Sequence, residues 1–173
     1  ATLHRLPEGP RRHQATTDAG VTPLFIACQE GHGGIVDSLL AQPGIDVNQA
    51  TTDAGVTPLF IACQEGHGGI VDSLLAQPGI NVNQARTDNG ATPLYIACQN
   101  GHGGIVDSLL AQPGIDVNQA RTDNGVTPLF GAFSKSHEQV VDRLLVQPGI
   151  DLRVPFDDHP ARDPPAIARL RDS

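Results

Sequence analysis

The chain has 173 residues and a formal net charge of −8, and only 3% of its residues are aromatic. No run of about 18 apolar residues occurs, so the sequence predicts no membrane span. Between residues 21 and 120 there are nine acidic side chains and a single base, Arg86. Because an acidic surface repels phosphate backbones and anionic lipids, we expect neither nucleic acid nor membrane to be the main ligand.

The sequence repeats itself every 35 residues. The string that begins at Val21 returns at Val56 with three changes, at Ala91 with four more, and at Val126 in a degenerate form. A fixed period of about 20–50 residues is typical of stacked repeat proteins, in which each unit buries its apolar surface against its neighbours. We therefore expect four repeats, at residues 21–55, 56–90, 91–125 and 126–152.

The first residues of the chain do not follow this period. Residues 1–12 fit it poorly and are interpreted as an N-terminal flank. Residues 13–18 already match residues 48–53, so the repeat region is predicted to run from residue 13 to residue 152, beginning with the loop that enters repeat 1.

Each repeat is predicted to contain two short helices. In repeat 1, Thr22 is a natural N-cap and Pro23 suits the first helical position, while Gly31 ends the first helix. A second helix begins at about His32 and stops at the Pro-Gly pair of residues 43–44. Its apolar side chains fall on one face: Ile35, Val36, Leu39 and Leu40.

Turn residues follow each helix pair. The sequences Asp53-Ala54-Gly55 and, one repeat later, Asp88-Asn89-Gly90 are typical of tight hairpins. Neither helix of a pair can bury its apolar face alone, so the units must stack. The sequence therefore predicts an all-α solenoid of helix-turn-helix units with projecting β-hairpin loops.

Glycine pairs weaken three of the predicted helices. They lie at residues 33–34, 68–69 and 103–104, where repeat 4 has Glu138-Gln139 instead. Glycine in a helix interior is about 1 kcal/mol less favourable than alanine. We expect substitution of these glycines to raise the melting temperature.

The repeat resembles the ankyrin repeat over roughly residues 13–152. The matching motifs of repeat 1 are Gly20-x-Thr22-Pro23-Leu24-x-x-Ala27, Gly31-His32, Ile35-Val36, Leu39-Leu40 and Asp46-Val47-Asn48, and they recur in the next two repeats. The period of 35 exceeds the family's usual value of about 33. Phe25, Phe60, Tyr95 and Phe130 stand where the family prefers histidine, and we expect them to pack as a ladder between repeats.

The resemblance implies a protein-binding scaffold that meets its partner through a concave groove and the hairpin tips. Carried over by position, the predicted binding residues are Gln29, Glu30, Asp53, Gln64, Glu65, Arg86, Asp88, Asn89, Gln99, Asn100, Arg121, Asp123, Asn124, Ser134 and Lys135. The small or apolar positions Val21, Ala54, Val56 and Ala91 lie between them. Repeat 4 departs from the pattern at Gly131, Phe133, Ser134 and Lys135, which we interpret either as a cap or as a specific anchor.

A cysteine recurs at one position of the first three repeats, and a histidine recurs at one position of all four. Stacked helices lie about 8–10 Å apart, beyond the Cα separation of about 7 Å that a disulfide tolerates. Cys28, Cys63 and Cys98 are therefore interpreted as small buried side chains in a reducing, cytoplasmic compartment. The histidines before the second helices are interpreted as turn and capping residues and not as metal ligands: His32, His67, His102 and His137.

No catalytic, cofactor-binding or metal-binding residues are predicted, and the protein is expected not to be an enzyme. The resemblance implies that Asn48, Asn83 and Asn118 stabilise the hairpins, and that such asparagines can be hydroxylated by a cytosolic asparaginyl hydroxylase in animals.

The last segment and two further functions stay open at this point. Residues 153–173 are rich in proline, and Asp163-Pro164-Pro165 before residues 166–170 indicates a short capping helix, or else a linker. The array could also be a regulatory or targeting segment of a larger enzyme or channel, or a spacer without a ligand. We expect a monomer that binds another protein, although near-identical repeats leave end-to-end self-association open.

Overall fold

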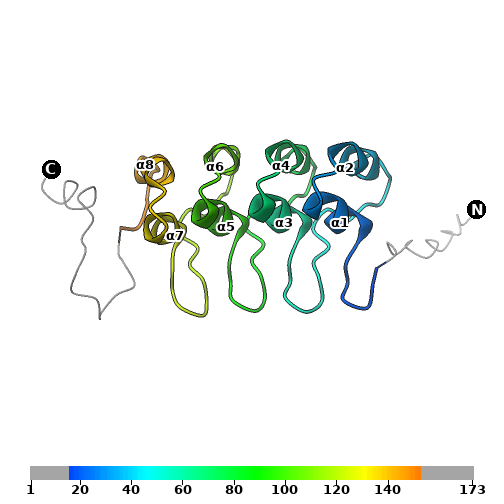
Figure 1. Cartoon of the computed structure of the whole chain (residues 1–173), viewed down its shortest axis with the longest axis horizontal. Coiled ribbons are helices and arrows are strands. Elements are labelled where there is room, and N and C mark those ends of the chain that lie inside the picture. Colours follow the sequence, from blue (N-terminus) through cyan, green and yellow to red (C-terminus); the bar gives the residue numbers. More distant parts are fainter. Residues whose placement is uncertain (1–15, 153–173) are drawn as a thin grey trace, which may run out of the picture.

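The computed structural model describes residues 16–152, and this part contains eight helices in four pairs. Figure 1 shows the pairs side by side in chain order, with the odd-numbered helices in one layer and the even-numbered helices in the other. The odd-numbered helices are α1 (Pro23–Gln29), α3 (Pro58–Glu65), α5 (Pro93–Asn100) and α7 (Pro128–Ser134). The even-numbered helices are α2 (Gly33–Leu40), α4 (Gly68–Leu75), α6 (Gly103–Leu110) and α8 (Glu138–Leu145). The predicted all-α stack is confirmed.

Two predicted segments lie outside the described residues. They are the N-terminal flank, residues 1–12, and the proline-rich cap or linker, residues 153–173.

A threonine N-cap begins every odd-numbered helix, and it is buried in the first three. The hydroxyl of Thr22 accepts a hydrogen bond from the backbone N–H of Phe25 at 3.0 Å, and Pro23 occupies the first helical position. The same arrangement recurs at Thr57, Thr92 and Thr127. The cap supplies an acceptor for one of the amide groups that a helix start leaves unpaired, so a threonine with no solvent exposure is satisfied.

The core is a row of equivalent small apolar side chains, repeated along the stack. Leu24, Leu59 and Leu94 are at most 1% exposed, and the alanine and cysteine that follow them in each helix are also buried. The even-numbered helices contribute Val36, Val71 and Val106, all fully buried. Thin layers of this kind need few aromatic residues, which agrees with the composition of the chain.

The aromatic ladder is confirmed between repeats 2 and 3. Phe60 and Tyr95 are 2% and 3% exposed and belong to one small cluster with Ala91. Phe25 is also buried. Phe130 is only partly buried, and its ring packs 6.0 Å from that of Phe133 in its own helix.

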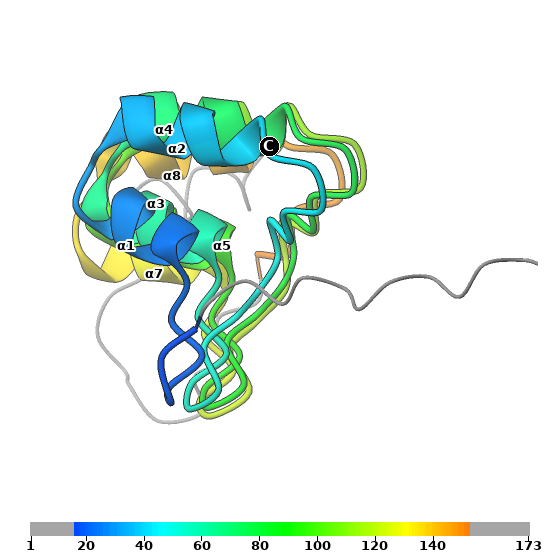
Figure 2. The ribbon, with the colours of Figure 1, turned by 90° about the vertical axis from the view of Figure 1, so that its right-hand side faces the viewer.

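A loop projects from the stack before each odd-numbered helix, and Figure 2 shows the four loops extending together from one side. We call these loops the fingers; their tips are residues 16–21, 51–56, 86–91 and 121–126. A backbone hydrogen bond closes each of the last three tips, as from Arg86 N to Ala91 O at 2.9 Å. A second backbone bond lies inside each of these tips, as from Gly90 N to Arg86 O at 3.1 Å. No residue of the described range is assigned to a strand, so the hairpins are held by these short closures and by their neighbours.

Neighbouring fingers are joined by their backbones. The N–H groups of Thr52, Thr87 and Thr122 each donate to a carbonyl of the preceding finger at 2.9 Å. Gly90 has a φ of 72°, and a Cβ there would lie 2.7 Å from the backbone nitrogen of Thr122. A side chain at this position would separate the fingers, so the turn glycine also fixes their spacing.

Candidate protein-binding surface

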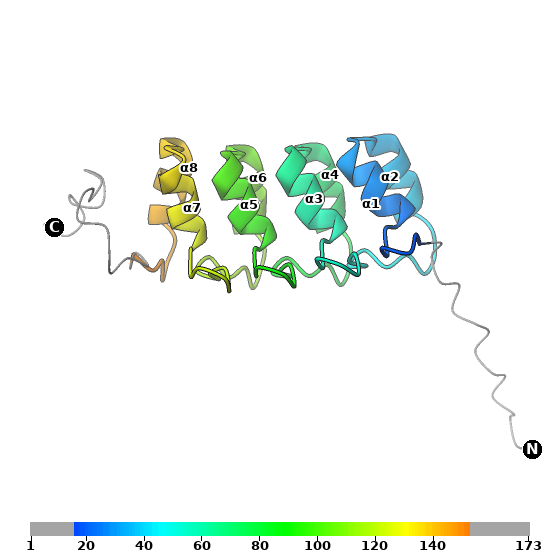
Figure 3. The same cartoon turned by 60° about the horizontal axis from the view of Figure 1, so that its bottom comes forward.

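The residues predicted to bind a partner fall into two rows that run along the stack. One row follows the finger tips, which lie side by side in Figure 3, and the other follows the C-terminal ends of the odd-numbered helices. The finger row contains Asp53, Arg86, Asp88, Asn89, Arg121, Asp123 and Asn124, together with Asp18, which occupies the equivalent place in the first finger. The helix-end row contains Gln29, Glu30, Gln64, Glu65, Gln99, Asn100, Ser134 and Lys135.

In the third and fourth fingers, an arginine and an aspartate two positions later form an ion pair. Nε of Arg86 donates to Oδ1 of Asp88 at 2.9 Å, and Arg121 makes the same contact with Asp123 at 2.9 Å. The guanidinium of Arg86 holds the pKa of Asp88 below its usual range. The structure thus brings these predicted residues together and neutralises each carboxylate locally.

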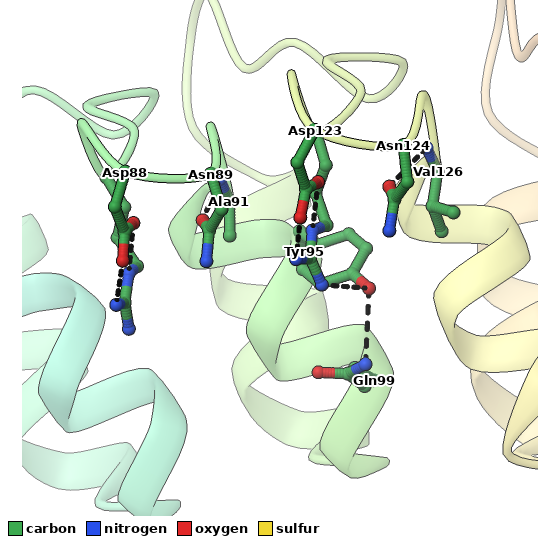
Figure 4. A network of polar contacts seen from close by, with 10 residues as sticks. Asp88, Asn89, Ala91, Tyr95, Gln99, Asp123, Asn124 and Val126 are labelled. Carbon is green, nitrogen blue, oxygen red and sulfur yellow. Dashed lines mark hydrogen bonds and ion pairs between the residues drawn. The ribbon is translucent and has the colours of Figure 1, made fainter. Parts of the chain in front are cut away.

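The same arginines cover the aromatic rings of the preceding odd-numbered helices. The guanidinium carbon of Arg86 lies 5.6 Å from the ring centroid of Phe60, and that of Arg121 lies 5.4 Å from the ring of Tyr95. The Tyr95 hydroxyl accepts hydrogen bonds from Arg121 at 3.4 Å and from Gln99 at 3.2 Å (Figure 4). Since the arginine side chains are only 24% and 20% exposed, they stabilise the array as well as forming part of its surface.

The predicted asparagines of the fingers shape the turns in which they lie. The side-chain oxygen of Asn89 accepts from the backbone N–H of Ala91 at 2.9 Å, and that of Asn124 accepts from Val126 at 3.0 Å (Figure 4). Such contacts between a side chain and the backbone two residues later are typical of turns. Their amide nitrogens carry the remaining hydrogen-bonding capacity that a partner could use.

The second finger lacks an arginine beside its aspartate. Thr51 stands at the place that Arg86 occupies one repeat later. The pKa of Asp53 is lowered, first by a hydrogen bond with the Thr51 side chain and then by the backbone N–H of Ala54, which donates at 2.7 Å. Asp53 is therefore an exposed carboxylate that stays ionised without a cation bonded to it.

The helix-end row changes composition along the stack. One equivalent position is exposed in every repeat: Glu30, Glu65, Asn100 and Lys135. Asn100 donates to the backbone carbonyl of Gln64 at 3.0 Å, and Gln64 donates to Glu65 at 2.9 Å. Asn100 and Glu65 are therefore exposed side chains whose terminal polar atoms are partly used in contacts with Gln64.

Two of the positions carried over from the family are not on the surface. Ala91 is 4% exposed and packs against Phe60 and Tyr95. Gly131 is buried, and a Cβ there would lie 3.2 Å from the ring of Tyr95. The expectation that Ala91 contributes to an exposed surface is therefore wrong, because the aromatic ladder covers it, and the burial of Gly131 leaves it no part in an exposed anchor.

Sequence analysis missed the role of the histidines. His67, His102 and His137 each place Nε2 at 3.1–3.3 Å from a carbonyl oxygen near the end of the odd-numbered helix of the preceding repeat. They occupy N-cap positions, but none caps its helix through its side chain. The rings lie against Gly31, Gly66 and Gly101 of the preceding repeat. The histidines are N-cap residues, as predicted, but their side chains make no capping bond, and the recurrent Gly-His pair forms a contact between repeats.

The asparagines of the Val-Asn positions also join repeats. Nδ2 of Asn83 donates to the carbonyl of Gly114 at 2.7 Å, and its Oδ1 accepts from the N–H of Asp116 at 3.0 Å. Asn48 and Asn118 make the same two contacts with the following repeat. These asparagines therefore have the stabilising role that was predicted, and they stabilise the contact between neighbouring repeats.

The three cysteines are free thiols in the core. Cys28, Cys63 and Cys98 have no solvent exposure and form no disulfide. Burial raises the pKa of the Cys28 thiol to about 12 and raises those of the other two as well. A protonated, inaccessible thiol is neither a nucleophile nor a metal ligand in the folded state.

Residues 16–152 hold no group of three or more histidine, cysteine or acidic side chains that could bind a metal ion. In the same range, no helix has the length and apolar character needed to cross a membrane.

Comparison with known families agrees with this architecture. A family model described as ankyrin repeats (3 copies) matches residues 2–86 and 83–155, which include all eight described helices. A comparison with curated proteins finds no match. With most of its length covered by the family model, the chain belongs to the ankyrin repeat family.

Proposed function

We propose that this chain is a non-enzymatic scaffold that binds another protein through the finger row and the helix-end row. Ankyrin repeats generally act as protein-interaction modules. The observation that carries the proposal is the register of the exposed polar positions: Glu30, Glu65, Asn100 and Lys135 recur at one place in each repeat. A regular row of this kind can contact a partner over several repeats at once.

The charge and the thiols indicate the kind of partner and compartment. The acidic array disfavours a phosphate backbone or an anionic membrane as the ligand, which leaves another protein. The three free cysteines agree with a reducing, cytoplasmic compartment. We propose that the chain is a monomer when it binds.

The test is capture of partners from cell lysate by the full chain and by two variants. The binding-surface variant carries Glu30→Arg, Glu65→Arg, Asn100→Arg and Lys135→Glu. The control carries Ala41→Arg, Ala76→Arg and Ala111→Arg, at exposed C-terminal ends of the even-numbered helices. The two variants change the net charge equally, so a difference between them reports position and not total charge.

The proposal expects partners that the wild-type chain and the control retain and the binding-surface variant loses, with unchanged helical circular dichroism in all three. If all three proteins capture the same partners, the helix-end row is not the binding surface. If none of them captures a partner, the array is better described as a spacer.

A further inference from the structure

Both rows of the binding surface change their charge at the same junction. When each finger is counted with the helix pair that follows it, the charged positions of both rows in repeats 1 and 2 are exposed carboxylates: Asp18, Glu30, Asp53 and Glu65. In repeats 3 and 4, the equivalent positions and the arginines beside them are Arg86, Asp88, Asn100, Arg121, Asp123 and Lys135. The first half of the surface thus carries only negative charge, while the second half carries three cations and two carboxylates.

The finger row changes because an arginine replaces a threonine. Thr51 occupies the place of Arg86, so the aspartate of the second finger has a hydroxyl beside it and not a guanidinium. In the third finger, Arg86 donates to both carboxylate oxygens of Asp88. The carboxylates of fingers 3 and 4 are therefore compensated within the chain, whereas Asp53 is available to a cation from outside.

The charge of the helix-end row also changes along the stack, and it does so through residues other than those of the finger row. At one equivalent position, repeat 2 has Glu65, repeat 3 has Asn100 and repeat 4 has Lys135. Asn100 is uncharged, and its amide donates to the backbone carbonyl of Gln64. The even-numbered helices do not share this gradient, because α8 carries Glu138 and Asp142 as well as Arg143, which pairs with Asp107 at 2.8 Å. The two rows of the binding surface are therefore the part of the stack whose charge changes along its length.

Building on the protein-binding function proposed above, we propose that the partner presents an extended segment whose cationic side chains are concentrated at one end, and that this end lies over repeats 1 and 2. Complementary charge fixes the orientation of such a segment, because reversal would place its cations over Arg86, Arg121 and Lys135. Stacked helices lie about 10 Å apart, and an extended chain rises about 3.3 Å per residue, so one repeat matches about three residues. Cationic residues at every third position would meet successive acidic repeats.

The test uses a random library of peptides of about twelve residues, which matches four repeats at about three residues each. Peptides selected on the immobilised full chain are sequenced, and a photo-crosslinking group is then placed at either end of the best binders. Affinities are measured for the wild type and for Glu30→Lys/Lys135→Glu, a swap that reduces the polarity of the helix-end row and leaves the net charge unchanged. The control, Ala41→Lys/Val146→Glu, also leaves the net charge unchanged, and it places one cation and one anion at the exposed ends of α2 and α8, with half the charge change at each site.

We expect selected peptides with lysine or arginine in one half, and crosslinks from that half to repeats 1 and 2. The swap should weaken binding about fivefold, because each of the two exposed charges contributes only a modest energy, and the control should not weaken it.

Two outcomes would overturn the proposed orientation and leave a protein-binding function intact. One is that the selected peptides have no cationic half, and the other is that their cationic half crosslinks to repeats 3 and 4. If no peptide is selected but the chain still captures partners from lysate, the extended segment is overturned and the protein-binding function is not. If the chain neither selects a peptide nor captures a partner, the proposed function is overturned as well.

Discussion

At the scale of single residues, burial determines the chemistry of the cysteines. Cys28 lies in a layer of leucine and alanine side chains, where a thiolate would lose its hydration. Burial accordingly raises the pKa of this thiol to about 12 in the folded protein. The folded state therefore favours the protonated thiol, and an unfolded chain releases the proton at lower pH.

This difference predicts a loss of stability in alkali. A group whose folded pKa is raised contributes stability that is complete below its unfolded pKa and is lost as the pH rises toward the folded pKa. For each of Cys28, Cys63 and Cys98, the free energy of unfolding should fall by about 1 kcal/mol between pH 9 and pH 10, and by up to about 1.4 kcal/mol over the next pH unit. Urea unfolding of the wild type and of Cys28→Ala/Cys63→Ala/Cys98→Ala at pH 8 and pH 10 measures the effect. An equal loss in both proteins would show that other groups are responsible.

Another residue-scale feature is the backbone of Ser136. It has a φ of 60°, the one positive φ of a non-glycine residue among residues 16–152, and it stands where repeats 2 and 3 have Gly66 and Gly101. A non-glycine residue in this region is strained by about 1 kcal/mol or more.

Ser136→Gly should therefore stabilise the protein by about 0.5–1 kcal/mol, the relief of strain being partly offset by a more flexible unfolded chain. Chemical denaturation measures the change. The reverse substitution, Gly101→Ser, serves as the control and should be destabilising, because a Cβ there would lie 2.6 Å from the His137 ring. A neutral or destabilising Ser136→Gly would mean that the serine side chain makes a compensating contribution.

At the scale of elements, the even-numbered helices begin weakly. α2, α4 and α6 start with two glycines, while α8 starts with Glu138 and ends near Arg143, charges that suit the two ends of a helix. A Cβ on Gly34, Gly69 or Gly104 would meet no atom within 4 Å. The glycines at these second positions are therefore not required for packing.

Gly34→Ala, Gly69→Ala and Gly104→Ala should each stabilise the protein, by up to about 1 kcal/mol, because alanine has the higher helix propensity. Thermal unfolding followed by circular dichroism measures the gain. Gly103→Ala is a matched control from the same helix, and it should gain less because its Cβ would lie 3.3 Å from the Arg143 guanidinium. Unchanged or lowered melting temperatures at all three open positions would contradict the propensity argument.

At the scale of the whole molecule, stability is distributed along one dimension. Each odd-numbered helix packs against the next, as α3 does against α1 and α5, and within residues 16–152 the buried side chains run along the whole stack. Ile26 and Ile35 of repeat 1 are 46% and 53% exposed, while their counterparts Ile61 and Ile70 are each 5% exposed. The central repeats are therefore buried from both sides, and the first described repeat is not.

Hydrogen exchange should show this gradient. The amides of α3 to α6 should exchange slowest, and those of α1 and α2 should exchange faster by local opening of repeat 1. Exchange measured by mass spectrometry on the full chain resolves the helices. Equal protection of all four helix pairs would mean that the array opens only as a single unit.

Much of the fold could be predicted because its signals are local and repeated. The Thr-Pro starts, the apolar stripe of the second helices and the 35-residue period determine helix pairs that must stack. These features depend on residues within one or two turns of each other, or on a repetition that is visible in the sequence itself. The same locality explains why the buried cysteines were predicted correctly.

The tertiary structure alone decided how the polar residues of the surface are used. Arg86 covers a ring 26 residues before it, and His67 contacts a carbonyl of Gln29, 38 residues before it. Such contacts depend on how far one repeat is rotated and shifted against the next, and no local pattern encodes that geometry. The sequence placed the exposed positions in order along the chain, whereas the stacking determined that Ala91 is covered and that Asp53 has no arginine bonded to it.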